Sequence, residues 1–250
     1  MFPTTRPQEP TTTVRRSTPA RTLRRLAGPT LALVLVAGAC SDADDDLDTA
    51  ACDAFAGVSA SFFGDPAEVP ATLEALEAAM PDDLADDAET YVSGLTASFE
   101  GDEAAMTDDS FLTASSTLGD AVFEDCGTAG AIDVDGVDFG FEGLPDELDA
   151  GRTVFRLTNA TESAEAHEMF IARKADGVTE SLSELLALPE EEGMSKIIPT
   201  GVVFSDAPGG QATTLVDLEP GDYVAICMIP TGGDGPPHFA EGMAAEFTVS

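Results

Sequence analysis

The spacing of the apolar residues changes near residue 130, and this change constrains the fold more than any other feature. Between residues 52 and 127, apolar side chains recur every three or four positions, and Pro and Gly interrupt them. This spacing predicts a small all-α domain of three or four short helices. From residue 130 to 250 the apolar runs are short and turn sequences such as Glu219–Asp222 separate them, which predicts an all-β sandwich.

The expected strands of the second domain follow seven apolar runs, and one segment between them differs. Residues 178–192 contain leucines at helical spacing and predict a short helix inserted between strands. The seven runs are 137–141, 153–157, 167–172, 202–204, 212–216, 223–228 and 245–249.

The first 39 residues have the three parts of a secretory signal. Arginines lie in residues 1–25, a short apolar run occupies residues 26–39, and the run ends in small residues. The run is too short to span a bilayer. Its end, Val36–Cys40, resembles the bacterial lipobox, in which the cysteine is lipidated and becomes the new N-terminus. The resemblance implies an exported lipoprotein on the outer face of the cell membrane, anchored through Cys40. An ordinary signal peptide cut near Ala39 is the alternative.

Three cysteines remain once Cys40 is assigned to the anchor, and they allow one disulfide in three pairings. Disulfides persist in exported proteins. Cys52 and Cys126 bracket the helical segment, so we predict a disulfide between them. Cys227 is then a lone thiol in an oxidising compartment, which favours burial or a bound metal. Residues 40–51, between the anchor and the first of these cysteines, predict an acidic tether.

The chain is strongly acidic, with 47 Asp and Glu against 11 Lys and Arg. Six of the basic residues precede residue 40, so the exported part carries almost all of the acids and five bases. Such a surface repels nucleic acid and anionic lipid headgroups. Nucleic-acid binding is therefore not expected, and a partner protein would be basic. Solubility is the ordinary explanation of this composition.

Four side chains in the β half could donate nitrogen or sulfur to a metal, and all four lie at the ends of expected strands or in the loop between them. The chain has only two histidines: His167 opens a strand, and His238 lies in a Gly- and Pro-rich loop. Cys227 ends the strand before that loop and Met243 opens the strand after it. Two imidazoles, one thiolate and a weak thioether suit copper. Zinc seldom takes Met, and calcium and magnesium prefer oxygen.

Residues 223–250 resemble the C-terminal signature of plastocyanin- and azurin-like blue copper proteins, the cupredoxins. The family has a Tyr-bearing strand, a Cys, a Pro-His, three residues, a Gly-Met and a final strand. The matching residues here are Tyr223, Cys227, Pro237, His238, Gly242, Met243 and Phe247–Val249. Upstream, residues 151–159 and His167 resemble the family's strand, Asn and first His ligand. The resemblance covers roughly residues 130–250. It implies a Greek-key β-sandwich holding one type 1-like copper ion through His167, Cys227, His238 and Met243.

Two features depart from the family pattern. Ten residues separate Cys227 from His238. Plastocyanins have far fewer, and this predicts a looser site or an altered colour and potential. Glu168 follows His167 where Asn is common, and we expect its carboxylate either to face solvent or to add a hard ligand.

These features predict a surface-anchored one-electron carrier that exchanges electrons through a partly exposed edge of His238 with a basic redox partner. A copper scavenger or chaperone is one alternative, and a metal-free cupredoxin-fold interaction module is another. Enzymatic activity is not expected. Multicopper oxidases and nitrite reductases need further His-rich copper sites, and both histidines are already used.

Overall fold

A computed structural model describes residues 46–250, apart from the side chain of Glu103. The predicted signal segment, the lipidation site Cys40 and residues 40–45 of the predicted tether lie outside the described residues. Within residues 46–250, no helix combines the length and the apolar character that crossing a membrane requires.

The N-terminal part is a layer of helices, as its apolar spacing predicted. Asp48 and Asp108 cap the first and last of the α-helices by accepting backbone N–H groups of Ala51 and Ser110. The elements are α1 (Thr49–Ser61), α2 (Val69–Ala79), α3 (Ala85–Phe99), the 3₁₀ helix η1 (Glu103–Thr107) and α4 (Asp109–Asp125).

The helical layer begins before Cys52, inside the predicted tether. Leu47 is buried and its backbone N–H donates to the carboxylate of Asp125 over 2.8 Å. Helix α1 then starts at Thr49, because Asp48 supplies its cap. The boundary of the tether at residue 51 is therefore wrong, and the packed chain starts at Leu47.

The predicted disulfide joins Cys52 in α1 to Cys126 directly after α4. It closes a loop with a sequence separation of 74 residues and so links the first helix of the layer to the last. The remaining described cysteine, Cys227, is free and buried.

Nine strands in the described part form a sandwich of two mixed sheets. One sheet has the order β2-β1-β4-β7 and the other has the order β3-β9-β8-β5-β6. The pairs β1–β4 and β3–β9 are parallel, and the other pairs are antiparallel. The strands are β1 (Gly130–Val137), β2 (Gly140–Glu142), β3 (Glu147–Leu148), β4 (Gly151–Asn159), β5 (His167–Lys174), β6 (Ile197–Ser205), β7 (Gln211–Leu218), β8 (Gly221–Ile226) and β9 (Ala244–Val249).

Two sequence predictions need correction here. The run 137–141 is not one strand, because Asp138 and Phe139 form a two-residue turn between β1 and β2, whose Val137 and Gly140 pair across it. The single short helix predicted in residues 178–192 is instead two, α5 (Leu182–Leu186) and α6 (Glu190–Met194), which runs past residue 192, because Pro189 separates them.

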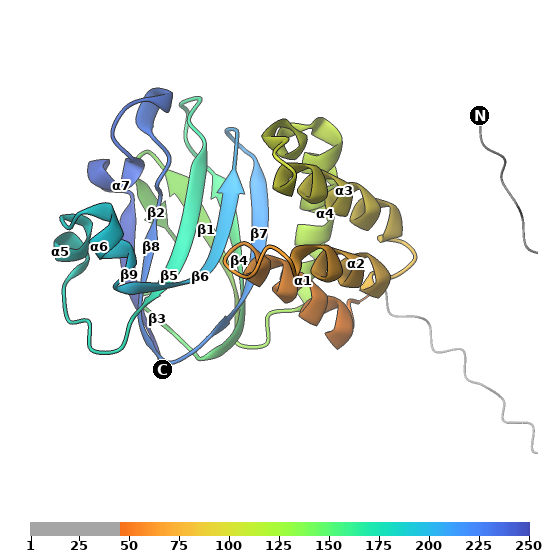
Figure 1. Cartoon of the computed structure of the whole chain (residues 1–250), viewed down its shortest axis with the longest axis horizontal. Coiled ribbons are helices and arrows are strands. Elements are labelled where there is room, and N and C mark those ends of the chain that lie inside the picture. Colours follow the sequence, from red (N-terminus) through yellow and green to blue (C-terminus); the bar gives the residue numbers. More distant parts are fainter. Residues whose placement is uncertain (1–45) are drawn as a thin grey trace, which may run out of the picture. The chain divides into compact units, whose positions relative to one another are not determined.

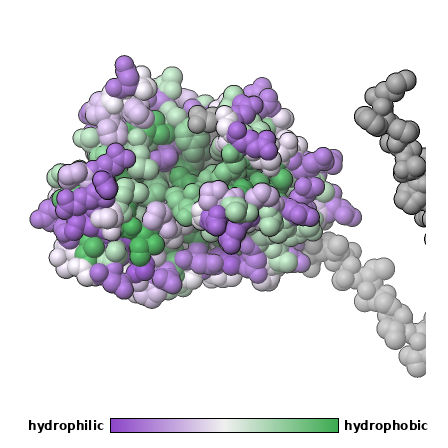
Figure 2. All heavy atoms as spheres, in the orientation of Figure 1, coloured by the Kyte–Doolittle hydropathy of each residue, from purple (hydrophilic) through white to green (hydrophobic). Residues whose placement is uncertain are grey.

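The helices pack on the outer face of the sheet that contains β4 and β7 (Figure 1). Val154 of β4 and Leu215 of β7 belong to the same buried cluster as the helical core. The hydroxyl of Ser59 in α1 accepts the backbone N–H of Leu215 over 3.3 Å. In Figure 2, apolar side chains gather where the helices meet the sandwich, and hydrophilic side chains cover much of the rest of this face. The helical layer and the sandwich thus share a core and form one compact unit.

Replacing both Cys52 and Cys126 by Ser should lower the free energy of unfolding by ~4 kcal/mol, because the unfolded chain regains the entropy of the closed loop. Urea unfolding followed by circular dichroism would measure this difference. The single variant Cys227→Ser serves as a control that leaves the disulfide intact. An unchanged urea midpoint in the double variant would contradict a stabilising role for the disulfide.

Candidate metal centre

The pairing of β8 brings three chain segments to one end of the sandwich. β8 runs antiparallel to both β5 and β9, so its end lies beside the starts of those two strands. His167 is the first residue of β5, and Cys227 directly follows β8. The helix α7 (His238–Glu241) lies between Cys227 and the start of β9. The order of strands therefore gathers the two histidines and the cysteine from distant parts of the sequence.

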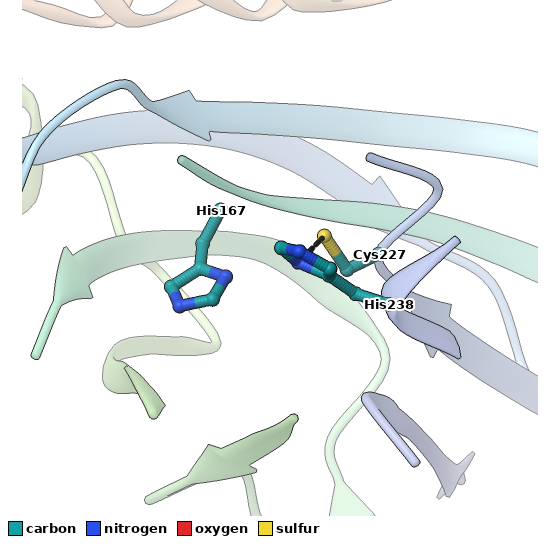
Figure 3. A group of neighbouring side chains, drawn as sticks. All are labelled: His167, Cys227 and His238. Atoms are coloured by element: carbon teal, nitrogen blue, oxygen red, sulfur yellow. Dashed lines mark hydrogen bonds between the residues drawn. The ribbon is translucent and has the colours of Figure 1, made fainter. Parts of the chain in front are cut away.

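His167, Cys227 and His238 form a compact group of donors (Figure 3). One ligand atom from each lies within 4.8 Å of the other two. The Sγ of Cys227 is 3.4 Å from Nδ1 of His238, and the two imidazole rings lie edge to face with centroids 5.2 Å apart. All three side chains are at most 1% exposed. This is the trio that the sequence predicted to hold a metal.

The imidazoles are buried with ring nitrogens that lack hydrogen-bond partners. Both nitrogens of His167 and Nε2 of His238 have none. A buried polar group without a partner costs about 1–3 kcal/mol, so natural proteins rarely retain several of them together. A metal cation bound beside the thiol would give these ring nitrogens the partner that they lack. The residues present therefore fit a metal ion.

The environment favours the protonation states that a metal ligand needs from histidine. Burial lowers the pKa of His167, and the neighbouring His238 lowers it further. The neutral imidazole is the form that ligates metals. Burial raises the pKa of the Cys227 thiol, so the thiol stays protonated until a cation replaces its proton.

Met243, the fourth predicted ligand, is fully buried beside the same loop. Its backbone N–H donates to the carbonyl of His238 over 3.0 Å, and its carbonyl accepts the N–H of Cys227 over 3.1 Å. These two bonds fix Met243 to both sides of the ligand loop. Coordination by its sulfur stays a prediction.

The ten-residue segment between Cys227 and His238 is folded tightly on itself. Pro230 and Pro237 form an isolated β-bridge, and the N–H of Thr231 donates to the carbonyl of Pro236 over 2.9 Å. The N–H of His238 donates to the carbonyl of Ile229 over 2.9 Å. The extra length thus forms a closed loop with its own hydrogen bonds. Its effect on the tightness, colour and potential of the site stays a prediction.

Glu168 takes neither of the two roles expected from the sequence. Its backbone N–H donates to Sγ of Cys227 over 3.4 Å, and its half-buried carboxylate accepts the N–H of Met228 over 3.2 Å. Burial raises the pKa of this carboxyl. Glu168 therefore links the start of β5 to the chain that follows Cys227, and it lies outside the group of clustered ligand atoms.

Two residues that the sequence did not assign to the site connect the loops that carry the histidines. The amide of the fully buried Asn159 donates to the carbonyl of Glu165 over 2.8 Å. The carboxylate of Glu165 accepts the N–H of Gly232 over 3.1 Å, and its Oε2 is 3.6 Å from Nε2 of His238. The match of Asn159 to the Asn of the resembling family could have pointed to its role. Nothing in the sequence distinguishes Glu165 from the many other acidic residues of this chain.

The predicted exposed edge of His238 is wrong, because this side chain is 0% exposed. The ring of Phe139 stands edge to face against it, with centroids 5.5 Å apart. Sequence reasoning placed Phe139 inside a strand and so missed that it covers a ligand.

Comparison with known proteins gave matches among solved structures alone. No family model matches the sequence, and no curated protein matches it either. Reduced auracyanin from the photosynthetic bacterium Roseiflexus castenholzii is 19% identical and covers 50% of this chain and 98% of its own, with a TM-score of 0.33. Auracyanin A, a "blue" copper protein of Chloroflexus aurantiacus, is 20% identical over 48% of this chain and 97% of its own, with a TM-score of 0.29.

Rusticyanin from Thiobacillus ferrooxidans is 21% identical and covers 50% of this chain and 79% of its own, with a TM-score of 0.29. Similarity at this level does not assign a metal, which depends on the donor atoms themselves. Those donors lie at the start of β5 and at both ends of the loop from Cys227 to His238, as the sequence resemblance implied. The β half of this chain is a mixed two-sheet β-sandwich with a buried His-Cys-His group at one end.

Proposed function

We propose that this protein binds one copper ion through His167, Cys227, His238 and Met243 and carries single electrons at the outer face of the cell membrane. The observation that carries the proposal is the group of buried donors without hydrogen-bond partners. A lipid on Cys40 would supply the anchor. We do not expect enzymatic activity, because both histidines serve the one site.

The donor set selects among metals. Two nitrogens and one thiolate with a weak thioether suit copper better than zinc or the hard divalent cations. Bound copper would supply the one-electron couple between Cu(I) and Cu(II). The protein's contribution is to hold the donors in place and keep water away from them.

The hydrogen bonds around the site support electron transfer over metal handling. Glu165 and Glu168 each join two of the segments that carry ligands, and Asn159 ties the end of β4 to the loop before His167. Donors held in this way move little when the metal changes oxidation state. A scavenger or chaperone needs an accessible ligand for exchange, and the three clustered donors are buried. In a metal-free interaction module, the buried ring nitrogens of His167 and His238 that lack hydrogen-bond partners would stay unpaired at a cost in stability.

Titration of the purified protein with Cu(II) should saturate at one equivalent and produce an intense thiolate-to-copper absorption band in the visible range. Electron paramagnetic resonance of the same sample tests for a type 1-like centre. Cys227→Ser should lose the intense band, because the thiolate is its electron donor. Absence of the band in the unchanged protein, with Cys227 still reacting as a thiol after unfolding, would overturn the proposal.

Met243→Leu should keep the visible band and raise the reduction potential, since removal of a sulfur donor disfavours Cu(II) more than Cu(I). Voltammetry of the copper-loaded protein measures the potential. Met169→Leu is the matched control, because Met169 is an equally buried methionine in the core of the sandwich. Equal potentials in both variants would remove Met243 from the ligand set.

Cys40→Ser should release the protein from the membrane fraction if Cys40 carries the lipid. Labelling of expressing bacterial cells with a radioactive fatty acid gives a direct readout, with label in the unchanged protein and none in the variant. Label that persists in Cys40→Ser, or an unchanged protein that is never labelled, would exclude the anchor. Either result would leave the copper site unaffected.

A further inference from the structure

The ring of Phe139 contacts the buried histidine His238 and also reaches the surface. His238 is 0% exposed, whereas Phe139 is 36% exposed. Their ring centroids are 5.5 Å apart, with the rings nearly perpendicular. Two partly exposed side chains therefore touch the buried imidazole: the phenyl ring of Phe139 against the ring and the carboxylate of Glu165 near Nε2. Phe139 is the aromatic one of the two.

The backbone of Phe139 is in a conformation that its side chain disfavours. Its φ is 58°, and it is the one non-glycine residue with positive φ in the part of the chain that the structure describes. Glycine is the usual residue at such a turn position, because a Cβ is strained there. The ring is 36% exposed, so part of it packs against the site and part of it faces solvent. A strained residue at a site is a pointer to function.

The turn is held against the loops of both histidines. The N–H of Ala160 donates to the carbonyl of Gly136 over 2.9 Å, and the hydroxyl of Thr161 bonds the carboxylate of Asp138. On the other side, a Cβ added to Gly242 would lie 3.4 Å from the carbonyl oxygen of Phe139. The backbone of the turn that carries Phe139 is thus held by the same segments that carry the histidines.

The surface around Phe139 is negative. Asp138 is exposed beside it, Glu241 is exposed next to Gly242, and the partly exposed Glu165 approaches His238. The five basic side chains of residues 46–250 each form ion pairs elsewhere, and none of them pairs with Asp138, Glu241 or Glu165. No basic side chain in these pairs therefore neutralises the carboxylates around Phe139. A partner that docks over the ring would therefore carry Lys or Arg around an apolar centre.

We propose that Phe139 is the contact through which electrons enter and leave the site, at the centre of a docking surface for a basic redox protein. The proposal rests on the proposed copper function. Bound copper would give one electron as Cu(I) to the oxidised centre of the partner, or take one as Cu(II) from a reduced partner, and no bond would form or break. Phe139 acts by position: its ring shortens the gap between His238 and the partner.

The test compares Phe139→Gly and Phe139→Leu with two control variants. Phe99→Leu changes a phenylalanine that is 43% exposed in the helical layer. Met228→Leu changes the exposed side chain next to Cys227, the other surface residue adjacent to a ligand. The copper-loaded proteins react with the cation tris(phenanthroline)cobalt(III) in a stopped-flow experiment at several ionic strengths. The visible band and its paramagnetic resonance show whether each variant still holds copper.

We expect Phe139→Gly to react about tenfold more slowly, which corresponds to ~1.4 kcal/mol in activation free energy, with an unchanged visible band. Phe139→Leu should fall in between, and Phe99→Leu should react as the unchanged protein does. The reaction of the unchanged protein should slow as salt is added, because the cation meets an acidic surface. Thermal unfolding of metal-free Phe139→Gly should occur at the same or a higher temperature, since glycine relieves the strained φ.

Three results would overturn the proposal. The first is a full rate in Phe139→Gly while Met228→Leu is slowed, which would place the contact at Met228 instead. The second is a lower unfolding temperature for metal-free Phe139→Gly together with an unchanged rate, which would make the ring a structural element only. The third is the absence of a visible band in the unchanged protein, which would remove the copper function and this proposal with it.

Discussion

The candidate site depends on the pairing of β8 with two antiparallel neighbours. Because β5 and β9 both run opposite to β8, the end of one strand meets the starts of two others. His167, Cys227 and Met243 occupy these positions, and the loop after Cys227 returns His238 to the same end. A shift in this register would move the donors to different depths and faces. The chemistry is therefore a consequence of strand order.

Burial of the histidines and the cysteine costs stability, and it also provides the conditions that metal binding needs. Ring nitrogens enclosed without partners destabilise the fold, yet the same burial lowers the pKa of His167, which favours its neutral form, and keeps water away. The surrounding protein compensates with bonds between segments, such as Glu168 to Met228 and Glu165 to Gly232. The helical layer packs on the other sheet, through Val154 and Leu215.

The sequence predicted the parts that depend on periodicity and on donor types. Helical spacing before residue 130 predicted the helical layer, and short apolar runs after it predicted the sandwich. The chain has two histidines, so few other nitrogen ligands were possible. Contacts that depend on three-dimensional proximity were missed. Glu165 is indistinguishable from other acids in so acidic a chain, and the apolar Val137 and Phe141 concealed a turn at Asp138 and Phe139.

The error at Phe139 is informative because local sequence preference and structure disagree there. Aromatic residues favour strands, and an alternating run around one predicts a strand. A turn with positive φ favours glycine, so tertiary contacts from the loops of both histidines must hold Phe139 in place. Natural sequences depart from local preference mainly where function requires it. Among residues 46–250 no other non-glycine residue has a positive φ. The one that does, Phe139, packs on a buried ligand, and this links the strain to the site.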